Sequence, residues 1–230
     1  MEPVEAPRVR AFAVQFGRIG PRPGWTNEMS EPNSWITTTA MLDALDDPAN
    51  QTVWVSFDAR YRPLVFALAR KLGLQDADAA DVAQQTLAEF VRAYRAGQYD
   101  RTRGRLSRWI IAIARKQICD LHRAHKRKRE RRGDSALANM PADEELDRMW
   151  ETERERVVRD LAWQELRSSA RTQEKTLRAF ELFTLQELPV ERVAVECGLS
   201  ADEVYRIKYR ITNRLREIVK RLTEAYAEEA

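Results

Sequence analysis

Glycine, proline and cysteine are all scarce in this sequence of 230 residues, which contains eight glycines, nine prolines and two cysteines. So few turn-forming residues argue against a β-rich or collagen-like protein and favour helices. The cysteines, Cys119 and Cys197, lie in separate helical segments, which indicates reduced thiols and not a disulfide framework. Apolar runs such as residues 64–69 are far shorter than the roughly 20 residues that span a bilayer, and no secretory signal begins the chain. We therefore expect a cytoplasmic protein without a membrane segment.

Charged residues make up 33% of the chain and are unevenly distributed, although the net charge is only +3. Residues 101–132 contain thirteen basic and two acidic side chains, a local charge of +11. Residues 134–160 reverse the sign, with nine acidic side chains and four arginines. The basic segment attracts a polyanion such as nucleic acid, whereas the acidic segment repels it. The order of the charges also suggests that the acidic segment shields the basic domain in the free protein.

Hydrophobic residues reach 43% of the chain, enough for a packed core, and their spacing is helical over most of the sequence. The pattern predicts an all-α protein of two small helical domains that are joined by a flexible linker, with a helix-turn-helix in the C-terminal domain. The expected segments are a disordered extension over residues 1–34, a first domain over 35–130, a linker over 131–145 and a second domain over 146–225.

Three local signals refine this division of the chain. Met29 is a plausible alternative start, so residues 1–28 are expected to be dispensable. Pro63 marks a kink or a restart in a helical segment of the first domain. Asp76 or Asp78 is expected to cap the next helix, which stops at Gly97.

A basic helix is predicted over residues 107–129, with Trp109 among its apolar positions. Basic side chains beside an aromatic ring suit phosphate contacts combined with stacking on an unpaired base. The alternative is a solvated basic face with Trp109 in the core. Cys119, His122 and His125 recur every three residues, but such steps drift around a helix and no fourth ligand is near. We therefore expect no metal and no other cofactor.

A short helix that Pro189 opens and Gly198 ends is followed by a closing helix, and Ser200 with Glu203 forms the pattern of a capping box. The apolar positions that share one stripe of the closing helix are Val204, Ile207, Ile211, Leu215, Ile218 and Leu222. In a helix-turn-helix the second helix enters the major groove and its early residues reach base edges. The alternative is an ordinary helical hairpin with a solvated outer face. No phosphate loop, nucleophile or paired carboxylates stand out, so we expect no enzyme. The side chains expected to face bases are Glu203, Tyr205, Arg206, Tyr209 and Arg210, and those expected to favour phosphates are Lys208, Arg214 and Arg216.

Several segments, taken in order, resemble one known family. They are FDARYRPLV at 57–65, DADAADVAQQ at 76–85, YDRTRGRLSRWI at 99–110, IAR at 113–115, LPVERVA at 188–194 and GLS at 198–200. In this order they resemble the extracytoplasmic-function class of sigma-70 family sigma factors, over about residues 36–224, and within it the sequences common in Planctomycetes-like bacteria. The resemblance implies an all-α subunit that binds core RNA polymerase, through its β′ clamp helices and β flap, and directs the enzyme to promoter DNA. It also leaves room for an anti-sigma factor as a further partner.

The resemblance assigns roles to individual positions. Polarity alone makes Asp81, Gln84 and Gln85 solvent surface, whereas the resemblance implies that they bind the polymerase clamp helices. The residues implied to read the −10 element are Arg108, Trp109, Arg115, Lys116, Asp120, Arg123 and Arg127. Those implied to read the −35 element are Ser200, Glu203, Tyr205, Arg206, Lys208, Tyr209 and Arg210.

Two departures from the family pattern and two other function classes remain. The family usually has Asn at the position of Lys116, so base preference does not transfer there, and it has an aliphatic residue at Cys197, which is a packing position. The chief alternative is a stand-alone helix-turn-helix regulator that binds duplex DNA, which would need a dimer interface and a palindromic site. A nuclease would need clustered metal-binding carboxylates, and the acidic residues here are scattered.

Overall fold

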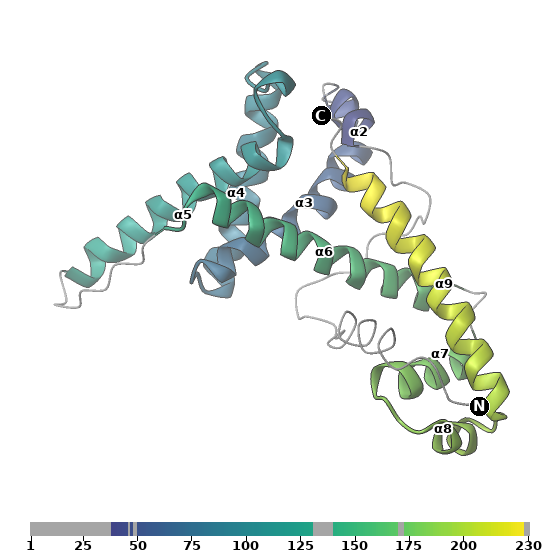
Figure 1. Cartoon of the computed structure of the whole chain (residues 1–230). Coiled ribbons are helices and arrows are strands. Elements are labelled where there is room, and N and C mark those ends of the chain that lie inside the picture. Colours follow the sequence, from purple (N-terminus) through teal and green to yellow (C-terminus); the bar gives the residue numbers. More distant parts are fainter. Residues whose placement is uncertain (1–37, 46, 48–49, 131–139, 170–172, 228–230) are drawn as a thin grey trace. The chain divides into compact units, whose positions relative to one another are not determined.

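The computed structural model describes residues 38–45, 47, 50–130, 140–169 and 173–227 (Figure 1). The predicted disordered extension, Met29 and most of the predicted linker lie outside these residues. Every regular element in the described part is a helix, which confirms the predicted all-α fold class. No helix among these residues combines the length and the apolar content that crossing a bilayer requires. In chain order the elements are α2 (Thr38–Leu45), α3 (Gln51–Lys71), α4 (Asp76–Arg95), η1 (Arg101–Arg103), α5 (Leu106–Glu130), α6 (Asp143–Ser168), α7 (Glu174–Phe180), the π-helical turn η2 (Glu181–Leu185), α8 (Val190–Cys197) and α9 (Ala201–Tyr226).

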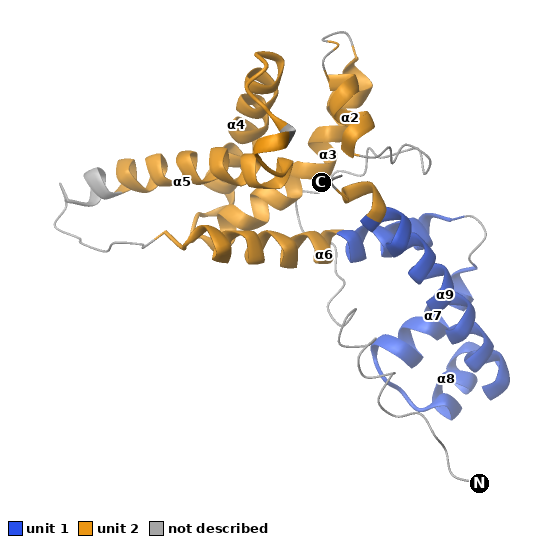
Figure 2. Cartoon of the chain, turned by 45° about the horizontal axis from the view of Figure 1, so that its top comes forward, with its two compact units in different colours: residues 1–32, 158–223 blue, residues 33–157, 224–230 orange. Residues whose placement is uncertain are grey.

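The described residues form two compact units, which are drawn in different colours in Figure 2. Unit 2 contains α2 to α5, α6 as far as Val157, and the end of α9 from Glu224. Unit 1 contains residues Val158–Thr223. The domain boundaries expected from the sequence, at 35–130 and 146–225, stay a prediction.

The core of unit 2 is built from the apolar faces of α3, α4 and α5. Phe57 and Phe90 are fully buried, and their rings stack at 4.8 Å between centroids with 14° between planes. Ile110, Ala114 and Ile118 of α5 are also fully buried and lie four residues apart, as one face of a helix requires. Burial of an aliphatic or aromatic side chain contributes about 1.5–3 kcal/mol, so this three-helix contact determines which face of α5 is left exposed.

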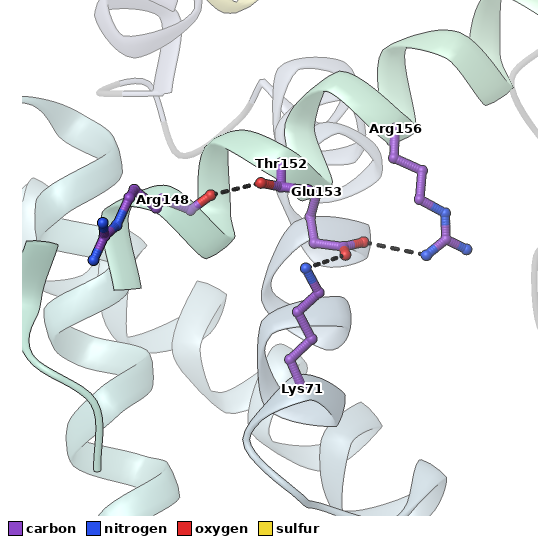
Figure 3. A network of polar contacts seen from close by, with 5 residues as sticks. All are labelled: Lys71, Arg148, Thr152, Glu153 and Arg156. Carbon is purple, nitrogen blue, oxygen red and sulfur yellow. Dashed lines mark hydrogen bonds and ion pairs between the residues drawn. The ribbon is translucent and has the colours of Figure 1, made fainter. Parts of the chain in front are cut away.

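The first half of α6 also belongs to the core of unit 2. Leu146 and Trp150 are 0% and 2% exposed, and Glu153 lies on the same helix face. The buried Glu153 carboxylate binds Lys71 Nζ of α3 at 2.9 Å and Arg156 of its own helix at 3.5 Å (Figure 3). A buried carboxylate is costly unless it is paired, so these two cations allow Glu153 to be buried beside α3.

The last turn of α9 is anchored in unit 2 by a buried arginine. Arg60 Nη1 and the Thr38 hydroxyl both donate to the carbonyl of Ala225, at 2.9 and 3.1 Å. The Tyr226 hydroxyl donates to the Arg60 carbonyl at 3.1 Å, and the Arg60 guanidinium lies 5.4 Å from the Tyr226 ring centroid. Burial raises the pKa of Tyr226, so the phenol stays protonated and can donate. The end carbonyl of a helix has no partner within the helix, and Arg60 supplies a charged one.

Unit 1 packs the second half of α6, together with α7 and α8, near the long helix α9. Trp163 of α6 and Phe180 of α7 are buried with ring centroids 5.9 Å apart. Val204, Ile211 and Leu215 supply part of the buried stripe of α9. The apolar spacing in the sequence predicted this stripe.

One local expectation about unit 2 is wrong, and of the kink or restart expected at Pro63 the restart is wrong. The N-cap of α4 is Gln75, which makes no side-chain capping bond, and Asp76 and Asp78 lie inside the first turn instead. Their negative charge is favourable at a helix N-terminus without a capping bond, and Asp76 also binds Arg70 Nε at 2.7 Å. Helix α3 continues through Pro63 and does not restart there, since it is one helix from Gln51 to Lys71.

Removal of the Tyr226 hydroxyl tests the anchor of α9. We expect Tyr226→Phe to lower the free energy of unfolding by about 0.5–1.5 kcal/mol, because a buried hydrogen bond to Arg60 is lost without a change of shape. Urea denaturation followed by circular dichroism measures this loss. The control is Tyr209→Phe at an exposed position, and a loss no larger than that of the control would contradict the anchor.

Candidate nucleic-acid interface

Helix α5 presents its polar side chains along two lines. Positions that are three, four or seven apart share one side of a helix. Arg108 and Arg115 therefore lie on one line, which we call the arginine stripe. The second line, the tryptophan stripe, consists of Trp109, Lys116, Asp120 and Arg123.

Trp109 is half-buried in an aromatic cluster at the start of α5. Its ring stacks on Tyr99 at 5.0 Å between centroids with 13° between planes, and meets Phe90 edge-on at 5.0 Å. The Tyr99 hydroxyl donates to the carbonyl of Gly104 at 3.4 Å, which links the ring to the loop before α5. Tyr99 therefore covers one face of the indole, while Phe90 ties it to the core.

The loop before α5 is organised by Asp100. Its Oδ1 accepts hydrogen bonds from the backbone amide and the hydroxyl of Thr102, at 2.9 and 2.7 Å. These bonds stabilise the charged carboxylate and lower the pKa of Asp100. Such a side-chain-to-backbone turn holds the chain between Tyr99 and α5 in a defined shape.

The rest of the tryptophan stripe is open to solvent. Lys116, Asp120 and Arg123 are exposed, and Arg123 Nη1 binds Asp120 Oδ1 at 3.1 Å. The side chain of Arg127 lies outside the described part of the chain. This stripe offers two cations beside an aromatic ring, which is a chemistry suited to a nucleic-acid strand.

The arginine stripe is occupied by carboxylates of α6. Arg108 Nε and Nη2 both lie 3.0 Å from Asp147 Oδ2, and Arg115 binds Asp143 Oδ1. The Arg108 side chain is 68% exposed, and exposed ion pairs of this kind each contribute up to about 1 kcal/mol. The pairs are therefore weak enough for a phosphate to replace.

The two histidines of α5 lie near other groups of the protein. His122 Nε2 lies 3.2 Å from the Leu72 carbonyl, and His125 Nε2 lies 3.8 Å from Asp78 Oδ2. Cys119 is half-buried. Within the described ranges, no three cysteine, histidine or acidic side chains gather as a metal site would require.

The polar face of α4 consists of Asp81, Gln84 and Gln85, all of which are exposed. The opposite face buries Val82, Ala83 and Leu87 in the core of unit 2. The exposed carboxylate and amides are thus held on a rigid helix, as a protein-binding surface requires.

Helices α8 and α9 of unit 1 are joined by a short turn. Gly198 has a φ of +58°, the left-handed conformation that ends a helix most readily with glycine. The capping box at the start of α9 is present: the Ser200 amide donates to Glu203 Oε2 at 2.7 Å, and the Glu203 amide donates to Ser200 Oγ at 3.3 Å. The Ser200 hydroxyl also donates to Glu203 Oε2, at 2.9 Å, and the Ser200 amide and hydroxyl together stabilise the charged carboxylate and lower the pKa of Glu203.

The early turns of α9 expose most of the side chains that the sequence singled out. Arg206, Tyr209 and Arg210 are exposed, and Tyr209 is 72% accessible. Tyr205 is exposed but meets the Phe183 ring edge-on at 5.4 Å, and Lys208 Nζ lies 5.4 Å from the centroid of the same ring. Phe183 therefore orients two of these side chains.

Sequence reasoning missed the residues that hold the interface in place. Tyr99, Asp143 and Asp147 were not singled out, although each contacts a predicted −10 residue. The only signal for Tyr99 was an aromatic side chain beside an arginine-rich loop. The change from a basic to an acidic segment was the signal for the aspartates. It did not predict which aspartate pairs with which arginine.

Comparison with known families identifies part of unit 2. Residues 57–128 match the family model Sigma-70 region 2. This match supports a sigma factor of the sigma-70 family. It also supports a role for this segment in RNA polymerase binding and promoter melting.

The match to region 2 covers α3 from Phe57, all of α4, and α5 as far as Lys128. It therefore includes the polar face of α4 and both stripes of α5. The exposed face of α9 lies outside it. Interaction with core RNA polymerase and promoter DNA is thus supported for the matched segment.

The capping box predicts how Glu203 titrates. Its pKa is lowered in the folded state, so its contribution to stability is present at neutral pH and is lost as the pH falls through the folded pKa. We expect Ser200→Ala to raise the pKa of Glu203 towards its ordinary value but not fully, because the residue-200 amide still donates. An NMR titration of the Glu203 carboxyl carbon measures the change.

The matched control for this titration is Ser168→Ala in the same unit. The Ser168 hydroxyl donates to the Glu165 carbonyl and does not contact Glu203. If Ser200→Ala and Ser168→Ala gave the same titration midpoint for Glu203, the side-chain half of the capping box would be refuted.

Proposed function

We propose that this protein is a sigma factor of the extracytoplasmic-function class, similar to those of Planctomycetes-like bacteria. It binds core RNA polymerase and directs the enzyme to specific promoters. In this proposal residues 35–130 carry domain two of the sigma factor, and residues 146–225 carry domain four. The protein supplies recognition and performs no catalysis.

The observation that carries the proposal is the region 2 match over residues 57–128. Within this span, one helix exposes Asp81, Gln84 and Gln85, and another exposes basic side chains beside Trp109. A sigma factor needs both a polymerase-binding surface and a strand-binding surface in region 2. The two surfaces lie on different helices of one compact unit, so they can be used at the same time.

At the −10 element, α5 would bind the opened strand through its two stripes. Arg108, Arg115 and Lys116 supply cations for the phosphates, and each phosphate neutralised adds about 0.7 to the dependence of log affinity on log salt for a single strand. Trp109 supplies an aromatic ring next to these cations. Because Tyr99 covers one face of Trp109, an unpaired base would stack on the pair of rings or displace Tyr99.

At the −35 element, the start of α9 would enter the major groove of duplex DNA. Arg206 and Arg210 are four residues apart and exposed, so both can reach base edges from one side of the helix. The capping box holds the first turn of α9 in helical form, and the exposed Tyr209 lies beside Arg210 in the sequence.

Binding to core polymerase tests the role of α4. We expect Asp81→Ala and Gln84→Ala each to weaken binding by roughly tenfold, because central interface contacts contribute about 1–2 kcal/mol. A pull-down with core RNA polymerase from the same organism measures the affinity, and promoter-dependent transcription in vitro measures the consequence. Both variants should keep the wild-type unfolding curve, since neither side chain is buried.

Gln98→Ala is the matched control for Gln84→Ala, because Gln98 is exposed just beyond the end of α4. It should bind core polymerase like the wild type. Failure of the wild-type protein to bind core polymerase would refute the proposal and favour the stand-alone regulator. Equal binding by all three variants would refute only the assignment of α4.

Upstream recognition tests the role of α9. We expect Arg206→Ala and Arg210→Ala to weaken −35-dependent initiation by roughly five- to a hundredfold, the range for loss of a bidentate base contact. The control is Arg216→Ala, an exposed position expected to contact phosphates, which should weaken initiation on every upstream sequence alike. If Arg206→Ala were equally damaging on a scrambled −35 sequence, direct base reading by Arg206 would be excluded.

A further inference from the structure

The beginning of α6 carries acidic side chains to the arginine stripe of α5. Asp143 pairs with Arg115, and Asp147, one turn later, pairs with Arg108, two turns earlier on α5. The order of the two pairs shows that α5 and α6 are antiparallel at this contact. Both partners of both pairs belong to unit 2.

The same face of α6 is held by buried side chains. Leu146 lies between the two aspartates in the sequence, Trp150 lies between Asp147 and Glu153, and both are buried. Glu153 is bound by Lys71 of α3 at 2.9 Å (Figure 3). Apolar packing and the Lys71 contact hold the helix, and this positions the two weak surface pairs.

We propose that the first two turns of α6 compete with DNA for the arginine stripe. This inference rests on the proposed function, because the competition matters only if Arg108 and Arg115 bind promoter phosphates. In the free chain the Asp143 and Asp147 carboxylates take the places of two phosphates. A phosphate can bind either arginine only when that arginine's aspartate partner releases it.

The aspartates of α6 block only one of the two stripes of α5. No carboxylate of α6 contacts Lys116 or Arg123 among the ion pairs of the described residues, so the tryptophan stripe stays open. Free protein should therefore bind a DNA strand weakly through the tryptophan stripe and more tightly once the arginine stripe is released.

The test is binding of a fluorescent single-stranded oligonucleotide to the free full-length protein, measured by anisotropy. We expect the double variant Asp143→Asn, Asp147→Asn to bind about three- to tenfold more tightly than the wild type, because two competing ion pairs are removed. Two more phosphate contacts should also steepen the dependence of log affinity on log salt by up to about 1.4. Asparagine keeps the size and polarity of each side chain, so α6 remains docked by Leu146 and Trp150.

The matched control is Glu144→Gln, Glu145→Gln, which changes the net charge equally at two positions between Asp143 and Asp147. Both glutamates are exposed. If the two double variants gained affinity equally, the gain would be a general charge effect and the competition would be refuted. No gain in the aspartate variant would refute it as well.

Lys71→Met gives a second test, because net charge and the proposed competition predict opposite changes in DNA affinity. The change removes a cation, so charge alone predicts weaker DNA binding. It also removes the α3 partner of Glu153 and loosens the docking of α6, so competition predicts tighter binding. Weaker or unchanged binding would overturn the inference.

Heparin separates this inference from the proposed function. It is a polyanion without bases, so tighter heparin binding by the aspartate variant reports release of the arginine stripe whether or not the protein is a sigma factor. A protein that fails to bind core polymerase but shows this gain would refute the proposed function alone. A protein that binds core polymerase and shows no gain with either probe would refute the competition alone.

Discussion

The packing of α3, α4 and α5 around Phe57 and Phe90 is the constraint on which the rest of unit 2 depends. Helix α5 must bury Ile110 and the apolar positions one and two turns beyond it, so its rotation about its own axis is determined by the core. The basic side chains between these positions must then face outward. A packed core thus creates two basic stripes with fixed positions, and Trp109 joins the core to one of them through its edge-on contact with Phe90.

Helix α6 combines two kinds of contact with this core. Its buried residues Leu146 and Trp150 supply most of the docking energy, because exposed ion pairs are individually weak. Its aspartates supply specificity for the arginine stripe. This division of roles lets DNA phosphates replace the two aspartates while Leu146 and Trp150 stay packed.

Residue preferences for helix ends and turns predicted much of the helical structure. They failed where a residue could occupy either of two positions in or beside a helix. The stop at Gly198 and the Ser200–Glu203 capping box follow from backbone preferences within a few residues, and both are present. Asp76 was expected to cap α4, but it lies in the first turn, where helix charge and Arg70 both favour it. Pro63 was expected to bend or restart α3; the helix does not restart there, because tertiary packing of its buried neighbours Leu64 and Val65 stabilises a continuous helix.

The sequence by itself determined the all-α class, the helical faces and the order of basic and acidic segments, because periodicity and charge are properties of neighbouring residues. Only the tertiary structure decided that Tyr99 stacks on Trp109, that Asp143 and Asp147 meet Arg115 and Arg108, and that Arg60 holds the end of α9. These partners lie between 10 and 165 residues apart in the chain, and the sequence alone contains no measure of their distance in space.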